Sequence, residues 1–285
     1  MKHCRCLRRR LPLRPLACAL TIGVLAAGCP GGGHAEPLVA LYDAFWAGLP
    51  AARIRLEIGG SGTHYRDGIA ISTLGLPRIV TRFRGVATAA GRLGPGRPAE
   101  PEQYDAVYSL RKRHDSRISM RFVAKGGALV AERGLGDTSR KPPLGEAYRR
   151  DAVDPLTAFE RIREALRATL NKGSGSFTVP VYDGARRFDV NGRVLPKPGA
   201  ASAVQVALTL RPIAGFKGES SDDGNPSDAP RPARLTLSND ARLLPLSVEV
   251  PVWSLPLVVR LDHLCSARQP CAPAPIILTT PPPAR

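Results

Sequence analysis

The sequence predicts a mainly β fold: a curved antiparallel sheet or half-open β-barrel with one central amphipathic helix at about residues 154–170. Two observations lead to this prediction. Short stretches in which apolar and polar residues alternate recur along most of the chain, and a period of two is that of a half-buried strand. Only Asp154–Leu170 has its apolar residues three and four positions apart, the spacing of a helix that buries one face.

Residues 1–35 have the pattern of a secretory signal. A basic segment precedes an apolar run, Leu16–Ala27, of about a dozen residues, which is too short for a lasting membrane anchor. Two processing sites compete. Cleavage after Ala35 would release the protein into the periplasm, whereas a lipoprotein-like box ending at Cys29 would leave a lipid-anchored membrane protein. We favour cleavage after Ala35.

The mature chain is predicted to begin with a meander of strands and to continue through loops and a hairpin. The expected strands are Leu38–Gly48, Ala51–Ile58, Thr63–Thr73, Ile79–Ala89, Ala106–Lys112, Arg117–Ala124 and Leu129–Arg133. Alternation is clearest in the second, where Ala52, Ile54, Leu56 and Ile58 are separated by charged residues. Gly- and Pro-containing stretches at Arg92–Pro101 and Gly136–Arg150 are expected to be loops.

The helix has a clear start signal. Asp154 suits the N-cap, because its carboxylate can accept from free backbone N–H groups, and Pro155 suits the first helical position. The apolar stripe is Leu156, Phe159, Ile162, Leu166 and Leu170, and the opposite face carries Glu160, Arg161, Arg163, Glu164 and Arg167. Glu and Arg side chains one turn apart can pair there. We expect this helix to cover the open face of the sheet; the other hypothesis is that it plugs or lids a cavity.

A hairpin turning at Asp183-Gly184 follows the helix. Further strands are expected at Ala203–Leu210, Arg234–Ser238, Leu246–Val252 and Leu257–Leu261, with a polar insert at Gly218–Pro232. No linker is long enough to separate two domains. We therefore predict one β-rich domain over residues 36–265 and a Pro-rich tail over residues 266–285.

The charge and the cysteine content of the sequence exclude some classes of function and of site. The net charge is +17, and six basic residues lie in the signal, which leaves +11 (17 less 6). No dense Lys/Arg run interleaved with aromatic residues follows the signal, so nucleic-acid binding is not expected. Cys265 and Cys271 remain in the mature chain, and an even pair in an oxidising compartment predicts a disulfide. His263 alone adds too few ligands for a metal site.

The sequence offers no catalytic constellation. It contains no Gly-x-Ser-x-Gly elbow, no paired metal-binding histidines and no phosphate-binding glycine motif before a helix. We expect neither an enzyme nor a cofactor.

The candidate ligand-binding residues are instead Tyr42, Trp46, Phe159, Tyr182, Arg186 and Arg187. Arg186 or Arg187 could grip an anionic head group at a rim. The alternative for that segment is a turn with Gly184 at positive φ and a cross-strand Arg–Asp pair. For the aromatic residues near Tyr42, the alternative is ordinary core packing.

Four segments together resemble the exported bacterial family catalogued as domain of unknown function 3108: Tyr42–Ile58, Arg111–Phe122, Val153–Phe159 and Val181–Val190. The resemblance covers roughly Leu38 to Leu264. Its most specific parts are the Asp-Pro-Leu-Thr helix start and the Tyr-Asp-Gly-x-Arg-Arg-Phe-Asp hairpin. It implies a cell-envelope location and a half-barrel similar to that of lipoprotein carriers, but no reaction. The polar insert and the cysteine pair depart from the family pattern.

Together these features predict a non-enzymatic periplasmic binding or carrier protein, with an apolar or lipid-like ligand held between sheet and helix. The alternative is a structural or assembly factor of the envelope that binds a protein partner through a sheet edge.

Overall fold

The computed structural model describes residues 37–75, 78, 82–94, 96–109, 115–139, 141–170, 175–196, 203–216, 229–252, 255–266 and 269–271. All of them belong to one compact unit, residues 34–285. The predicted signal with its two processing sites, most of the polar insert and the tail beyond Cys271 lie outside these ranges. Within them, no helix is long and apolar enough to span a membrane.

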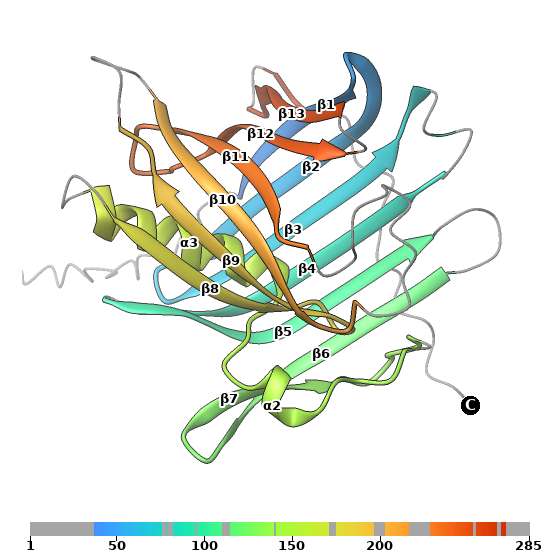
Figure 1. Cartoon of the computed structure of the whole chain (residues 1–285), viewed down its shortest axis with the longest axis vertical. Coiled ribbons are helices and arrows are strands. Elements are labelled where there is room, and N and C mark those ends of the chain that lie inside the picture. Colours follow the sequence, from blue (N-terminus) through green and yellow to red (C-terminus); the bar gives the residue numbers. More distant parts are fainter. Residues whose placement is uncertain are drawn as a thin grey trace, which may run out of the picture. The chain divides into compact units, whose positions relative to one another are not determined.

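Thirteen strands form one antiparallel sheet, which curves into a nearly closed barrel around the helix α3 (Figure 1). The order across the sheet is β7-β6-β5-β4-β3-β2-β1-β13-β12-β11-β10-β9-β8. The strands are β1 (Leu38–Trp46), β2 (Leu49–Ser61), β3 (His64–Thr73), β4 (Arg84–Gly94), β5 (Arg97–Ser109), β6 (Asp115–Lys125), β7 (Ala128–Arg133), β8 (Ser176–Tyr182), β9 (Arg187–Val194), β10 (Ala203–Ala214), β11 (Arg231–Ser238), β12 (Pro245–Val252) and β13 (Leu255–Leu264). The predicted fold class is confirmed.

A short extended segment, residues 150–153, joins the two edges of this sheet. Arg150 forms a bridge with Val130 of β7, and Val153 forms a parallel bridge with Val181 of β8. On the β8 side, the amide of Val153 donates to the Pro180 carbonyl at 2.9 Å, and the amide of Tyr182 donates to the Val153 carbonyl at 2.8 Å. Pro180 is tolerated there because an edge position does not need its missing N–H. The barrel is thus closed by single bridges rather than by a full strand pair.

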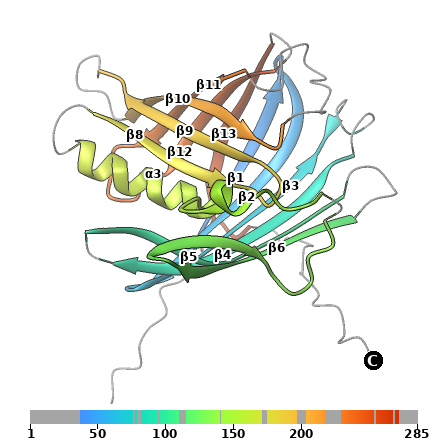
Figure 2. The same cartoon turned by 60° about the horizontal axis from the view of Figure 1, so that its bottom comes forward.

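The helix α3 (Pro155–Leu170) lies inside the barrel, between the β8–β9 pair and the β4–β5 pair (Figure 2). Its predicted apolar stripe meets three clusters of the core. Leu156 packs among residues of β3–β6, Phe159 against β1 and β2, and Ile162 with Leu166 against β8–β11. The helix therefore fills one end of the barrel as a plug, because sheet surrounds it on several sides.

One expectation about the helix was wrong. Glu160 and Arg163 were expected on a polar outer face, but they are 4% and 7% exposed. The reason is the same enclosure by the sheet. The two side chains form an ion pair, and Arg163 also donates through Nε and Nη2 to the Arg242 carbonyl at 2.9 and 2.6 Å. Pairing and hydrogen bonding compensate for the burial of both charges.

The largest differences from the predicted strand boundaries lie in β4 and β5. The fourth strand is shifted to Arg84–Gly94, and the expected loop Arg92–Pro101 is instead the tip of a long β4–β5 hairpin. Glycine and proline indicated a loop, but here they mark a bulge where the register shifts. At Gly91 a Cβ atom would lie 2.2 Å from the Glu100 carbonyl oxygen and 2.6 Å from the Tyr65 hydroxyl, so only glycine fits. The expected loop 136–150 likewise contains one short helix, α2 (Glu146–Arg149).

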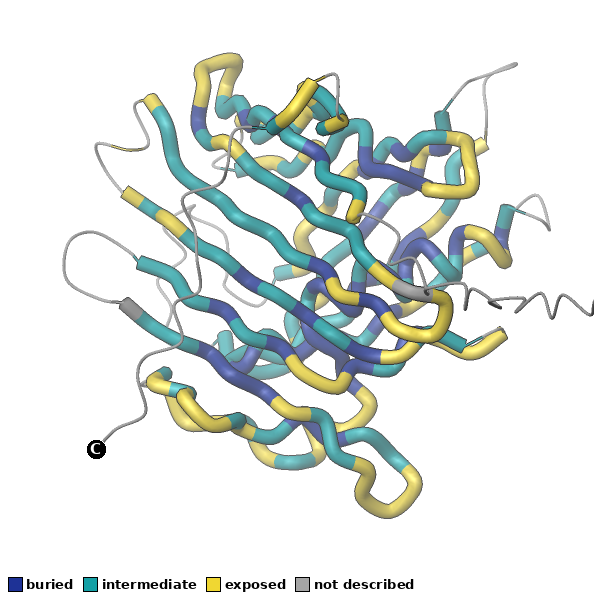
Figure 3. Tube along the Cα trace, turned by 180° about the vertical axis from the view of Figure 1, so that it is seen from behind, coloured by how far each residue is buried: buried dark blue, intermediate teal, exposed yellow. Residues whose placement is uncertain are grey.

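Burial is concentrated in the middle of the strands and falls toward the hairpin tips (Figure 3). The outer face of β1 and β2 carries ion pairs such as Arg53–Asp43 and Arg55–Glu57, as the alternation in β2 predicted. After β13, the sulfur atoms of Cys265 and Cys271 lie within bonding distance, with their Cα atoms 5.2 Å apart. This is the arrangement of the predicted disulfide.

The cap of α3 offers a test of this architecture. Asp154 is fully buried, and its Oδ1 accepts from the amides of Leu156 and Thr157 at 3.0 and 2.9 Å. Asp154→Ala should lower the free energy of unfolding by about 2–4 kcal/mol, because it removes the cap and leaves buried donors unpaired. Asp154→Asn keeps an acceptor and should cost about 1 kcal/mol.

Urea denaturation followed by circular dichroism would measure both changes. Glu102→Ala, which removes an exposed carboxylate paired with Arg92, is the matched control and should cost less than about 1 kcal/mol. Equal losses for Asp154→Ala and Glu102→Ala would contradict the proposed importance of the cap.

Candidate functional site

A cavity of about 450 Å³ lies beyond the N-terminal end of α3, between strands β3–β6 and the loop that joins β8 to β9. Its floor consists of inward-facing residues that sit opposite one another across neighbouring strands. One row is Ile69, Ala87, Ala106 and Ile118, and the next begins Ile71, Gly85 and Tyr108. Phe83, Val86, Val107 and Tyr104 complete the largely apolar lining.

Small residues create this space. Gly85, Ala87 and Ala106 occupy the central positions of the floor, where larger side chains would reach toward the opposite wall. The same face carries Ala89 one row closer to the helix, where Leu156 fills the room that the small side chains leave. The cavity therefore begins beyond the N-terminal end of α3, where no helix residue covers the small residues of the floor.

The β8–β9 loop, residues 183–186, forms the opposite wall. Asp183 Oδ1 accepts from the amides of Ala185 and Arg186 at 2.9 and 2.7 Å, which holds the loop in a tight turn. Gly184 has φ of 98°, and a Cβ atom there would lie 2.5 Å from Cγ2 of Ile118. The loop rests directly on β6 for this reason, and it closes this side of the barrel.

Two cations line the cavity along with one acid. Arg186 belongs to the loop, and its guanidinium carbon lies 5.7 Å from the centroid of the Phe216 ring. Lys141 comes from the segment between β7 and α2, and Asp183 is the acid. The cavity thus combines an apolar floor with a polar, net positive wall.

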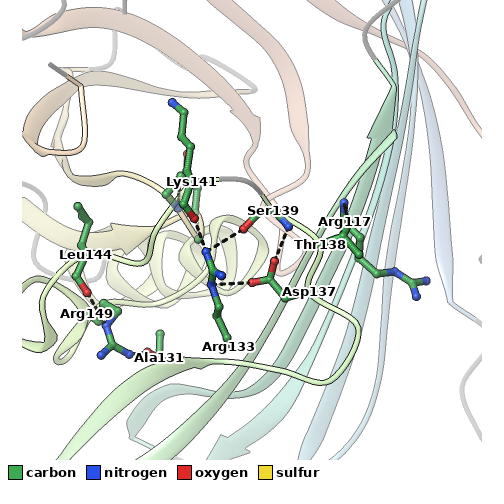
Figure 4. Close-up of polar contacts among 12 residues, drawn as sticks. Arg117, Ala131, Arg133, Asp137, Thr138, Ser139, Lys141, Leu144 and Arg149 are labelled. Atoms are coloured by element: carbon green, nitrogen blue, oxygen red, sulfur yellow. Dashed lines mark hydrogen bonds and ion pairs between the residues drawn. The ribbon is translucent and has the colours of Figure 1, made fainter. Parts of the chain in front are cut away.

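The segment that carries Lys141 is held by Arg133, as Figure 4 shows. Arg133 Nη2 donates to the Ser139 hydroxyl at 3.3 Å and to the Lys141 carbonyl, and Arg133 Nε pairs with Asp137 at 3.3 Å. Thr138 exchanges two hydrogen bonds with the backbone of Arg117, at 3.0 and 3.1 Å. These contacts fix the backbone of Lys141.

Of the six predicted ligand-binding residues, the structure places one at this cavity. Arg186 lines it. Tyr182 lies behind the loop, where it is 2% exposed and its hydroxyl donates to the Gly184 carbonyl at 2.8 Å. Arg187 pairs at 2.5 Å with Asp189 on its own strand, and not across strands as the alternative for this turn had it.

The three remaining predicted residues lie elsewhere. Tyr42 and Phe159 belong to the core cluster of β1 and β2, where burial raises the pKa of Tyr42. Trp46 lies at the end of β1 and donates through Nε1 to the Val252 carbonyl at 3.4 Å. Ile69, Tyr104 and Lys141 line the cavity but were not predicted as ligand-binding residues. The run of Gly and Ala in β4 was a sequence signal that could have indicated the cavity.

A buried polar network lies between the helix and β3. The Tyr65 hydroxyl contacts the Thr157 hydroxyl at 2.5 Å, and Thr157 donates to Asp154 Oδ2 at 2.5 Å. Burial raises the pKa of Asp154 to about 6.

Asp67, on the same strand, is 2% exposed, and its Oδ2 has no hydrogen-bond partner among the described residues. Burial and the negative charge of Glu160 raise the pKa of Asp67 to about 8, against the opposing effects of the Gly59 amide and Arg163. This raised pKa favours the protonated form of Asp67 at pH 7.

One group of side chains in the described part of the chain has the spacing of metal ligands: His263, Cys265 and Cys271, with ligand atoms within 4.8 Å of one another. The two sulfur atoms lie within bonding distance of each other, and cysteines joined in a disulfide have no thiolate to offer a metal. The His263 ring contacts Asp262 at 2.8 Å.

Comparison with known proteins adds a likeness of fold. No protein family matches the sequence. No curated protein matches it either. Among solved structures, the chain is similar to a beta-barrel-like protein of domain of unknown function DUF1849 from Brucella abortus, with a TM-score of 0.49 and 11% sequence identity. The match covers 80% of this chain and 97% of that chain.

The raised pKa of Asp67 predicts how stability depends on pH. The unfolded chain loses this proton near pH 4 and the folded protein near pH 8, so the folded state binds more protons in between. The contribution of Asp67 to stability should therefore fall as pH rises from about 4 to about 8. Asp67→Asn has no proton to lose, so its unfolding free energy should exceed that of the wild type at pH 8 and converge with it near pH 4.

Urea denaturation at several pH values would measure the difference. Asp154 contributes a slope of the same sign up to about pH 6 in both proteins, so only the difference between them reports on Asp67. Parallel stability curves for the two proteins would show that Asp67 ionises normally in the fold.

Proposed function

We propose that this protein is a non-enzymatic binding or carrier protein of the cell envelope, and that it holds an apolar or lipid-like ligand beside the end of α3. The observation that carries the proposal is the cavity of about 450 Å³ with its apolar floor. This volume lies in the range of small-molecule sites, which bury most of a ligand against apolar side chains and orient it with a few polar groups.

The distribution of charge supports an amphiphile with an anionic head. Ile69, Ile71 and Ile118 can contact an acyl chain, while Arg186 and Lys141 can bind a carboxylate or phosphate at the wall. Asp183 Oδ1 accepts from two amides of its own loop, and these hydrogen bonds partly compensate the negative charge of the carboxylate.

The proposal includes membership of the exported family of domain of unknown function 3108 and a periplasmic location. The motif segments and the signal pattern of the sequence support both. N-terminal sequencing of the exported protein should find Glu36 as the first residue. An acylated Cys29 would instead establish the lipid-anchored form, and an intact Met1 would contradict export through this signal.

Binding of a protein partner through a sheet edge is the alternative. The edges favour it less, because Arg150 covers part of β7 and Val153 covers part of β8. A partner strand would have to displace these bridges or pair beyond them.

Native mass spectrometry after gentle extraction tests the carrier function. We expect the exported protein to retain a lipid, and Ala106→Phe to abolish its retention, because the ring would occupy the floor of the cavity. Gln103→Phe places the same ring on the exposed outer face of β5 and should leave retention unchanged.

A double variant controls for the possibility that overpacking by Ala106→Phe impairs folding. The double variant Lys141→Gln/Arg186→Gln leaves the floor intact and should weaken binding of a fluorescent fatty acid by about tenfold or more, if each cation contributes a charge-assisted contact. Lipid retention that is identical in Ala106→Phe, Gln103→Phe and the wild type would overturn the proposal.

A further inference from the structure

A second cleft lies on the other side of α3, away from the cavity described above. It is formed by the tip of the β4–β5 hairpin, the outward side of α3 and the edge strand β8, and it encloses about 590 Å³. The residues that matter here are Arg97 on the hairpin, Arg161, Glu164 and Arg167 on the helix, and Thr178 on β8. The cleft is distinct from the cavity beyond the N-terminal end of the helix, and the two share no lining residue.

The charges in this cleft are not balanced. Among the described residues that line it, there are three guanidinium groups and one carboxylate, that of Glu164. Glu164 Oε2 already accepts from the Ala99 amide at 2.9 Å. No carboxylate in the described part of the chain forms an ion pair with Arg97, Arg161 or Arg167.

Arg161 is the best placed of the three cations. Its Nε donates to the Ala99 carbonyl at 2.9 Å, which fixes the guanidinium plane against the hairpin. No other hydrogen bond holds its two Nη groups among the described residues. Partial burial lowers the pKa of Arg161, which means that its charge is poorly solvated and would be stabilised by an anion.

Arg97 and Arg167 are exposed, and they supply the charge on either side. Arg167 Nη2 makes a long contact of 3.3 Å with the Ala241 carbonyl, and its pKa is lowered by partial burial and by the neighbouring Arg163. Arginine presents its donors in a planar fork that matches phosphate oxygens two at a time. Three such groups around one cleft suit a doubly charged oxyanion better than a single carboxylate.

We propose that the cleft formed by Arg97, Arg161 and Arg167 is a second binding site, which takes the phosphate group of a small phosphorylated ligand or of a lipid headgroup. The recognition chemistry is the same for both sources. The site is independent of the ligand held in the apolar cavity, so the two can be lost separately.

Isothermal titration calorimetry with pyrophosphate at low ionic strength tests the site on the whole exported protein. Arg97→Gln/Arg167→Gln should weaken binding by at least about tenfold, because two charge-assisted contacts are removed. Arg121→Gln neutralises one exposed arginine on the outer face of β6 and shows the effect of losing a single charge away from the cleft; it should change the affinity less than about twofold.

A variant of opposite sign sharpens the test. Glu164→Gln removes the one acid among the described residues of the cleft, while its amide oxygen can still accept from Ala99. It should tighten pyrophosphate binding several-fold. Equal weakening by the double variant and by Arg121→Gln, or the absence of binding in the wild type, would overturn the proposal.

Sedimentation with vesicles distinguishes the two sources of phosphate. Vesicles that contain phosphatidylglycerol should sediment the wild type but not Arg97→Gln/Arg167→Gln if a lipid headgroup is the ligand, and phosphatidylcholine vesicles should sediment neither. Arginine-dependent binding of pyrophosphate without vesicle binding identifies a soluble ligand. Dependence of neither probe on the two arginines would rule the site out.

Discussion

The backbone of residues 150–154 is the constraint on which the rest of the molecule depends. Within five residues it covers the edge of β7, pairs with the edge of β8 and then caps α3 through Asp154. The same residues therefore connect the two edges of the sheet and begin the helix that lies inside it. Buried hydrogen bonds from Asp154 through Thr157 to Tyr65 also connect the start of the helix to β3.

The helix does not fill the whole interior of the barrel, and the cavity lies where the strand residues are small. Leu156, in the first turn of α3, packs against the sheet, whereas Gly85, Ala87 and Ala106 leave an apolar space beyond the helix. On the other side the helix presents arginines to the gap between the β4–β5 tip and β8. The two spaces differ in chemistry because strand residues form the floor of the apolar cavity, whereas α3 contributes Arg161 and Arg167 to the cationic cleft.

Local patterns sufficed to predict the helix, its cap, the antiparallel strands and the cysteine pair. Long-range enclosure could not be predicted in this way. Glu160 and Arg163 looked like an exposed pair because helical spacing reveals only one apolar stripe, whereas the sheet surrounds α3 on several sides. The predicted fourth strand ended at Ala89, before Gly91, because the close neighbours that require glycine there, Glu100 and Tyr65, come from other strands. The aromatic residues Tyr42 and Phe159 were predicted as ligand-binding because they are large, whereas the cavity is marked by the small side chains of Ala87 and Ala106.

The way the barrel closes has a mechanical consequence. Every neighbouring pair of strands is joined by a ladder of four to ten residue pairs, whereas residues 150–153 are joined to each edge by a single bridge. Local opening follows the path with the fewest hydrogen bonds to break. The barrel would therefore open first between β7 and β8, where residues 150–153 join the two edges. The interior would then be accessible from the side of the barrel, while the hydrogen bonds between all neighbouring strands stayed intact.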